Sequence, residues 1–457
     1  MKWLIGLVLV LSPLLGCAEA VEPVQPAELE PLPERYPIVR EILFKGNTVT
    51  KRKVMDREMR IEVGDPARPN DIKDSRQAIQ NIGLFKQVIV DQVPVDGGVA
   101  LVFTVVEKWY LLPYPRLDYN SDREFAFGFK LDWSNLGGLN HQLEALVSRQ
   151  ENAEDDRGDA TEFEFDYFAP YAWDSAIDVG LGVSHDITPI EEEDAAGEII
   201  NYKEDYSRFS VLALRRLTPG HGSQGWRIGG GLLWQNETLR GTEAPLENGM
   251  ATAAVIQGRY EQIDDRLYSQ AGWQFGWRVE AASEDIASDY DYIDLRLSYF
   301  RAIPLWDVPH QTLRILADVG SYHGGPRDFD AYGLGGGSNL RGFDKEEFEG
   351  DAYWRLSLEY QRPLFGYKPV RGLVVMDLGR TYEDFDDLTF SHTQADAGIG
   401  LGVAERPFVP LPLHLRSPLP PTRPCSVPFF RNLSPVIRVS SRAHVPTPRP
   451  HRRHRRR

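Results

Sequence analysis

The sequence is poor in cysteine and, beyond residue 20, in long apolar runs. Its two cysteines, Cys17 and Cys425, lie near opposite ends of the 457-residue chain. Cys425 has no partner once Cys17 is cleaved off or acylated, so no intrachain disulfide is expected to support the fold. A run of about 18 apolar residues is missing after residue 20, which excludes a transmembrane helix. If the chain enters a membrane, it must therefore cross as a β-barrel.

Basic residues are scarce over most of the chain. The formal net charge is −16, and residues 405–457 alone hold twelve arginines against one glutamate. The remaining residues are therefore more acidic than the total suggests. This balance argues against a nucleic-acid partner, because such partners require a basic face.

Signatures of catalysis and of metal binding are also missing. The histidines His141, His185, His221 and His323 are scattered without ligand spacing, and no nucleophile elbow or paired acidic motif is present. Acidic runs such as residues 151–159 and 186–205 lack fixed ligand spacing, so we expect solvated loops there. We predict that the protein is not an enzyme and that it has no catalytic residue, metal or cofactor.

The first twenty residues predict export. Lys2, the apolar run Leu4 to Leu15, and Ala18 to Ala20 match the three regions of a secretory signal peptide. Leu14-Leu15-Gly16-Cys17 also matches a lipoprotein cleavage box, which makes Cys17 a candidate for lipidation. We favour ordinary cleavage, because a lipid anchor adds little to a barrel that spans the membrane. Five prolines over residues 21–37 then predict a linker without helix or strand.

A compact α+β domain is predicted over residues 38–107. Residues 38–44 alternate like a strand and reach the turn pair Gly46-Asn47. A helix is expected over residues 51–60, capped by Thr48 or Thr50, and a second over residues 71–81, capped by Asn70 and ended by Gly83. Two strands, over residues 87–93 and 99–106, complete the order strand, helix, helix, strand, strand.

Residues 115–403 alternate between apolar and polar side chains. Aromatic residues share one face of residues 125–133, and the same pattern recurs over residues 163–167, 273–279, 293–299 and 354–360. Such segments, about ten residues long, suit strands that cross a hydrocarbon layer about 30 Å thick. A soluble β-sandwich is the alternative, but aromatic outer faces, charged inner faces and long acidic loops favour a membrane barrel. We count ten strands before residue 322 and three after residue 351.

Glycines cluster between two of these strands, in the segment Ala331 to Phe343. A phosphate loop is disfavoured, because neither a helix pattern nor Gly-Lys-Ser/Thr follows. An ordinary surface loop is one alternative. The other is a loop that folds into the barrel and places Arg341 against a wall carboxylate, for which Asp377 is the candidate. Asp377 shares a face with Leu373 and Val375, which we expect to face lipid, so this pairing requires a bulge or a shifted face. The other face, with Val374, Met376 and Leu378, is also apolar, so the pairing is a hypothesis.

These motifs resemble a known family. Phe44 to Asn47, Gly64-Asp65, Asn81 to Phe85 and Val102 to Glu107 resemble a polypeptide-transport-associated (POTRA) domain. Leu340-Arg341-Gly342-Phe343 resembles the inward-folded lid-loop motif of the outer-membrane superfamily, bacterial surface antigens included, to which BamA, TamA and the two-partner secretion transporters belong. Met376-Asp377-Leu378-Gly379 resembles its partner strand motif. The resemblance assigns POTRA motif positions to Gly46, Asn47, Gly83, Leu84 and Phe85, lid-loop positions to Gly336, Gly337, Leu340, Arg341, Gly342 and Phe343, and barrel partner positions to Asp377 and Gly379.

The resemblance implies an all-β transmembrane antiparallel barrel, 16-stranded in the family, in the outer membrane of a Gram-negative cell. One α+β POTRA domain would precede it in the periplasm, and Arg341 would pair with Asp377 to lock the loop. The implied function is the assembly, insertion or translocation of polypeptides, with a passive porin as the alternative. The implied partners are client polypeptides or nascent outer-membrane proteins, outer-membrane lipid and periplasmic accessory proteins. Clients would add to the edge of the strand at residues 87–93 and pass a weak seam between the first and last barrel strands.

The sequence departs from that family at its C-terminal end. Residues 404–457 are rich in proline and arginine and close in His454-Arg455-Arg456-Arg457. Proline-rich segments cannot supply ladder donors, so we expect about two closing strands to be missing. A basic arm for anionic lipid is one interpretation of this tail. A disordered tail from a frame-shifted or truncated reading frame is the interpretation we favour.

Overall fold

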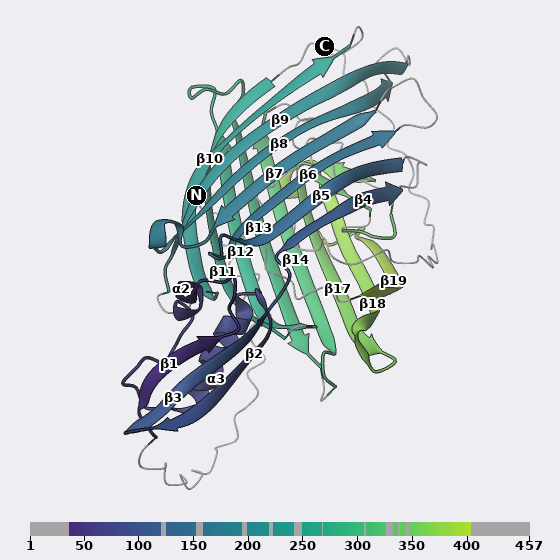
Figure 1. The fold of residues 1–457 in the computed structure, drawn as a ribbon. Coiled ribbons are helices and arrows are strands. Elements are labelled where there is room, and N and C mark those ends of the chain that lie inside the picture. Colours follow the sequence, from purple (N-terminus) through teal and green to yellow (C-terminus); the bar gives the residue numbers. More distant parts are fainter. Residues whose placement is uncertain are drawn as a thin grey trace.

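The computed structural model describes residues 36–119, 125–151, 159–193, 199–218, 223–241, 249–266, 268–305, 308–325, 332–336, 339–343 and 347–403. The signal segment, Cys17, most of the linker, His221, Gly337 and the tail at residues 404–457 lie outside the described residues. The described chain forms a small α+β domain at one end of a large curved sheet (Figure 1). Among the described residues, no helix is long and apolar enough to cross a membrane.

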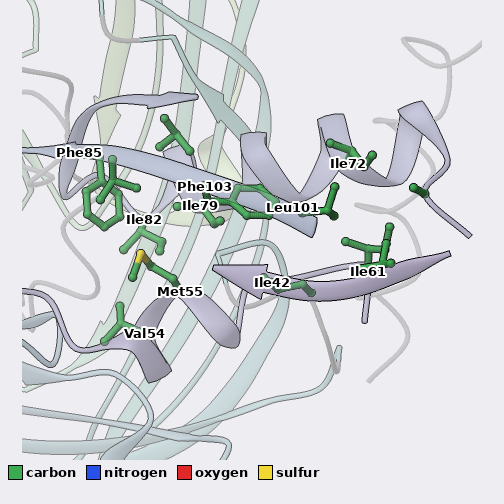
Figure 2. Packing of buried hydrophobic residues seen from close by; sticks show 14 of the residues in the cluster. Ile42, Val54, Met55, Ile61, Ile72, Ile79, Ile82, Phe85, Leu101 and Phe103 are labelled. Atoms are coloured by element: carbon green, nitrogen blue, oxygen red, sulfur yellow. The ribbon is translucent and has the colours of Figure 1, made fainter. Parts of the chain in front are cut away.

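The N-terminal domain has the predicted order of strand, helix, helix, strand and strand. Its elements are β1 (Val39–Lys45), α2 (Arg52–Asp56), α3 (Pro69–Asn81), β2 (Phe85–Val95) and β3 (Gly98–Glu107). The strands form one sheet in the order β1-β3-β2, in which β1 runs parallel and β2 antiparallel to β3. Apolar side chains from both helices and all three strands meet on one side of this sheet, including Met55, Ile79 and Phe103 (Figure 2). Burial of this apolar surface stabilises the domain.

Two helix caps differ from the prediction. Helix α2 spans Arg52–Asp56, and its N-cap residue, Lys51, makes no side-chain cap. The hydroxyls of Thr48 and Thr50 instead each donate to Glu107 over 2.6 Å. In α3 the N-cap is Arg68, and Asn70 lies inside the first turn behind Pro69. The predicted caps are therefore wrong: proline is favoured at the first helical position, and the two threonines serve a contact from β3 that lies far away in sequence.

The large sheet contains fourteen antiparallel strands in sequence order, apart from an inserted hairpin. They are β4 (Leu111–Tyr119), β5 (Phe125–Leu136), β6 (His141–Glu151), β7 (Ala160–Ala169), β8 (Ile177–Glu193), β9 (Ile199–Arg216), β10 (Gly225–Arg240), β11 (Gly249–Asp265), β12 (Gln270–Ala282), β13 (Tyr292–Pro304), β14 (Thr312–Gly324), β17 (Ala352–Leu364), β18 (Tyr367–Tyr382) and β19 (Gln394–Val403). The hairpin pairs β15 (Tyr332–Leu334) with β16 (Phe348–Gly350). Two short 3₁₀ turns, at Ala172–Asp174 and Phe385–Asp387, lie between strands.

The sheet starts earlier than predicted and remains open. Eleven strands lie before the hairpin, rather than ten, because β4 was not recognised. Pro113 and Pro115 interrupt its pattern, and proline is tolerated in a strand at the edge of a sheet. Within the described ranges, β4 and β19 are the two edges and do not pair with each other, so the barrel is not closed.

Alternation along the strands separates an apolar outer face from a charged inner one. Phe129, Val147 and Ile256 are among the large apolar side chains that remain exposed on the outside. The inner face carries buried ion pairs, such as Arg355 with Asp318 at 2.6 Å and Arg296 with Asp294 at 2.5 Å. A charged lining is stable only where each charge finds a partner, and these pairs supply one.

Candidate functional site

The segment between β14 and β17, here called the lid loop (described over residues 332–336, 339–343 and 347–351), lies against the inner face of the sheet. Tyr332, Leu334 and Leu340 are fully buried. They belong to one apolar cluster with inward side chains of the wall from β9 to β17, among them Leu233 and Tyr353. The lid loop is therefore packed inside the curved sheet and is not an ordinary surface loop.

Asn339 fixes the turn that precedes Arg341. Its side-chain oxygen accepts hydrogen bonds from the amides of Gly335 and Leu340, each at 2.6 Å, and its amide group donates to the Gly333 carbonyl at 3.3 Å. Gly336 has a φ of +90°, which a side chain would strain. Its amide donates to the Phe343 carbonyl at 3.1 Å, which closes the loop around its tip.

Arg341 contacts two carboxylates on neighbouring strands. Its Nη2 lies 2.5 Å from Glu359 of β17, and its Nε lies 3.3 Å from Asp377 of β18. Nη2 also donates to the Ser357 hydroxyl at 3.1 Å, and that hydroxyl donates to Asp377. Glu359 holds a second cation, because Nη1 of Arg314 lies 3.0 Å from its other oxygen. The predicted partner Asp377 is thus within ion-pair distance of Arg341, and Glu359 is closer.

The predicted orientation of β18 is wrong. Leu373 and Val375 are buried, with 3% and 4% of their surface exposed, whereas Val374 and Met376 are 51% and 42% exposed. Leu373, Val375 and Asp377 therefore face the interior together. The register of β18 runs without a shift from Arg371 to Tyr382, so no bulge is needed to bring Asp377 inward. Apolar residues occupy both faces of this strand, and hydropathy alone does not distinguish lipid from a packed interior.

The remaining residues of the lid-loop and partner motifs either leave space for the loop or pack against it. A Cβ on Gly379 would lie 3.2 Å from the Leu334 side chain and 3.1 Å from the Trp354 carbonyl, so glycine leaves space for the loop above β18. Phe343 packs edge to face on Phe348 with ring centres 5.0 Å apart.

The residues at the POTRA motif positions lie in the turns and in the core of the N-terminal domain. Gly46 has a φ of +86°, and a Cβ there would lie 2.1 Å from the Val105 carbonyl oxygen. Asn47 donates to the Thr50 carbonyl at 3.1 Å. Gly83 follows α3 with a φ of +83°. Leu84 and Phe85 are fully buried. These residues position the domain, and none of them carries a chemically reactive group.

Residues at the ends of barrel strands and in the turns between them bind the N-terminal domain. Asn81 at the end of α3 donates to Asp264 at 3.1 Å and accepts from the Asp265 amide at 2.9 Å. On α2, Lys53 and Arg57 both reach Asp174, at 2.7 Å and 2.5 Å. These bonds join the two helices to the ends of β11 and to the turn between β7 and β8.

A second group of contacts buries a carboxyl group between the domain and the barrel. The Glu58 carboxylate accepts from the Ser223 amide at 2.9 Å. Burial raises the pKa of the Glu58 carboxyl, against the opposing effect of Arg216. Nearby, the Tyr171 ring lies between two guanidinium groups, with Arg57 of α2 at 4.5 Å and Arg216 of β9 at 4.1 Å from its centre. The domain is therefore attached at several separate points.

Three site residues were not recognised from the sequence: Ser357, Glu359 and Asp396. Ser357 and Glu359 belong to the polar face of the strand over residues 354–360, so the alternation did mark them as inward. The stagger between strands decides which carboxylate contacts the loop tip, and this stagger is a three-dimensional property. Within the described residues, no group of three His, Cys, Asp or Glu side chains is placed to hold a metal ion.

Family models match two parts of the chain. The model described as the Omp85 superfamily domain matches residues 135–419, more than half of the chain. The POTRA model, described as a surface antigen variable number repeat, matches residues 37–108. The POTRA match ends where the N-terminal domain gives way to the large sheet, and the Omp85 match begins inside that sheet, near the end of β5.

A curated relative and two solved structures are also similar. The outer membrane protein assembly factor BamA of Neorickettsia risticii (strain Illinois) is 34% identical over 110 residues, which are 23% of this chain and 14% of that protein. CdiB from Escherichia coli has a TM-score of 0.56 at 16% identity, covering 80% of this chain and 70% of that one. CdiB from Acinetobacter baumannii has a TM-score of 0.50 at 13% identity, covering 80% and 68%. The matched segment is a small part of BamA, and the structural likenesses show a shared fold.

Proposed function

The chain belongs to the Omp85 superfamily, and from this membership we propose that it inserts or translocates client polypeptides at the outer membrane. The barrel lies in the outer membrane, and the N-terminal domain is a POTRA domain in the periplasm. The relative named as an assembly factor matches over a short segment, so the choice between assembly and secretion is part of the proposal. We assign no catalytic residue.

The packed lid loop is the observation that carries this proposal against a passive porin. A porin needs a water-filled lumen, but here Tyr332, Leu334 and Leu340 fill the space beside the inner wall. The Arg341 ion pairs with Glu359 and Asp377 hold them there. A lumen that is partly occupied by the protein's own loop suits a protein whose passage is regulated.

The exposed edge of β2 is the proposed client-binding surface. The order β1-β3-β2 leaves β1 and β2 as edges, but the segment at Gly64 and Asp65 covers the start of β1, with hydrogen bonds to Val39 of 2.8 Å and 2.9 Å. On β2, Ile89 and Val93 are exposed. An extended client that adds to β2 would gain backbone hydrogen bonds and would pack on these side chains.

The edge strand β4 is the proposed barrel side of the seam. Pro113 and Pro115 lie in this strand and have no N–H group, so two of its ladder donors are missing. A strand with fewer donors pairs weakly with any strand beyond it. A client strand could therefore compete for this position with little loss of existing hydrogen bonds.

Site-specific photocrosslinking in intact cells tests the proposed function. A crosslinker at Ile89 on the β2 edge should capture exported polypeptides, identified by mass spectrometry as outer-membrane or secreted proteins. The same crosslinker at Glu41 on β1, the edge strand whose start is covered, is the matched control and should capture few. Equal capture at both positions, together with a large steady conductance in planar bilayers that Arg341→Ala leaves unchanged, would favour the passive porin.

A further inference from the structure

The tip of the lid loop also contacts β19, the outermost strand of the described sheet. The amide of Gly342 donates to the Asp396 carboxylate at 3.0 Å, and the preceding amide, of Arg341, donates to Asp377 at 3.4 Å. Asp377 and Asp396 stand directly opposite each other on β18 and β19. Two successive backbone amides of the loop therefore bind two adjacent carboxylates.

Close packing explains why residue 342 is a glycine. A Cβ at this position would lie 2.6 Å from the Cβ of Asp396 and 3.1 Å from its carboxyl carbon, which is closer than side chains approach. The absence of a side chain lets the Gly342 amide reach the strand. The contact with Asp396 is thus part of how the loop tip fits the wall.

Like charges that stand opposite each other on neighbouring strands destabilise the pairing of those strands. Asp377 and Asp396 form such a pair. The two loop amides and the Arg341 guanidinium, which lies 3.3 Å from Asp377, offset this repulsion. Withdrawal of the loop tip would leave the two carboxylates facing each other without these donors.

We propose that Asp396 is a positioning residue that makes the pairing of β19 depend on the lid loop. The loop tip then binds three successive strands, through Glu359 on β17, Asp377 on β18 and Asp396 on β19. In the described sheet, β18 is the hydrogen-bonded neighbour of β19, and the lid loop is its second attachment. Release of the loop would loosen β19 while β17 and β18 stay paired. The use of this loosening to admit a client rests on the proposed function.

Hydrogen–deuterium exchange on the full-length protein in lipid nanodiscs tests this inference. Asp396→Ala should speed exchange about tenfold at the Gly342 amide, the loss expected for one charge-assisted hydrogen bond. The effect along β19 should be smaller, because this substitution also removes the charge opposite Asp377. Asp396→Asn keeps an acceptor oxygen and should have a smaller effect at the loop tip. Gln394→Ala, on the same strand and without a recorded contact to the loop, is the matched control and should leave exchange unchanged.

Gly342→Ala provides an independent second variant, because it displaces the loop tip and leaves the Asp396 charge in place. It should speed exchange along β19 more than Asp396→Ala does, because both carboxylates remain while the loop donors are displaced. Unchanged exchange along β19 in Gly342→Ala would overturn the inference, as would an equal increase in every strand from β5 to β18. If Gly342→Ala does not fold, unchanged exchange at the Gly342 amide in Asp396→Ala would overturn it. The measurement uses purified protein without a client, so its failure leaves the crosslinking test of the proposed function unaffected.

Discussion

Nη2 of Arg341 lies 2.5 Å from Oε1 of Glu359, and this ion pair joins the lid loop to β17. Glu359 is fully buried and also binds Arg314 at 3.0 Å. Asp377, the partner that the family resemblance suggests, lies 3.3 Å from Nε of the same arginine. The lid loop is therefore held by two buried carboxylates, one of which is shared with the barrel wall.

Arg341→Ala should destabilise the folded barrel by about 3 kcal/mol, because it leaves buried carboxylates without one of their cations. Arg341→Lys should fall between this variant and the wild type, since lysine keeps the charge but loses the planar fork that reaches two carboxylates. The measurement is urea unfolding followed by heat-modifiable migration on gels. Arg380→Ala, at a half-buried site near the end of β18 where the arginine donates to the Ser391 carbonyl, is the control. Equal unfolding midpoints for all variants would contradict the assigned role of Arg341.

Glu359→Gln should destabilise the barrel more than Asp377→Asn. Glu359 is the counter-ion of two arginines, Arg341 and Arg314, whereas a single ion pair, with Arg341, is seen for Asp377. Neutralising Glu359 therefore leaves more uncompensated buried charge. A double-mutant cycle with Arg341→Ala gives the coupling energy of each pair. A larger coupling energy for the Asp377–Arg341 pair would contradict this prediction, because Glu359, the closer carboxylate, would then contribute less to holding the loop.

Asn81→Ala should loosen the attachment of the POTRA domain to the barrel without unfolding either part. The substitution removes the bonds to Asp264 and to the Asp265 amide, at 3.1 Å and 2.9 Å. An unpaired buried polar group costs about 1–3 kcal/mol. Distances between spin labels on the POTRA domain and the barrel should broaden in the variant. Gln87→Ala, on the exposed part of β2, should keep the narrow distribution.

The alternation of side chains made most of the architecture predictable. The POTRA element order, the antiparallel sheet and the three strands after residue 351 follow from local patterns and turn residues. β4 was missed because Pro113 and Pro115 break its pattern. The predicted caps at Thr48, Thr50 and Asn70 failed because tertiary contacts and a proline decided those helix ends.

The sequence motifs of the site could be predicted, but the contacts between them could not. The glycine-flanked Arg341 and the strand at Asp377 stand out by motif. Glu359 and Asp396 differ from other inward carboxylates only in the strand stagger that brings them beneath the loop tip. The faces of β18 were assigned the wrong way round because a packed interior accepts aliphatic residues as readily as lipid does.

Acidification should loosen the turn between β1 and α2 through Glu107. Burial raises the pKa of this carboxyl, but hydrogen bonds from Thr48 and Thr50 and from the Val49 amide outweigh it and lower the pKa to about 2. A lowered pKa means that the ionised form stabilises the fold. This stabilisation is complete above the ordinary value of 4.5 and is lost as the pH falls from there towards 2.

Amide exchange at Thr48 to Thr50, corrected for the intrinsic pH dependence, measures this effect. Protection should fall as the pH drops below 4.5 in the wild type and should be low at every pH in Glu107→Gln. Glu41→Gln, on the exposed surface of β1, should retain the wild-type profile. Protection that stays constant from pH 4.5 down to about 2 would contradict the prediction.

The inward and outward faces of β18 can be distinguished by nitroxide accessibility. Single spin labels at residues 373 to 376, in a protein with Cys17 and Cys425 replaced by serine, should alternate in their collision rates with oxygen, which concentrates in lipid. Labels at Val374 and Met376 should collide often, because these side chains are exposed on the outer face. Labels at Leu373 and Val375 should collide rarely, because they share the buried face of Asp377. The opposite alternation would turn Asp377 towards lipid, and a carboxylate there could not reach Arg341. Uniformly high rates would instead indicate that β18 does not pack against the lid loop, so both outcomes bear directly on the ion pairs that hold the lid loop.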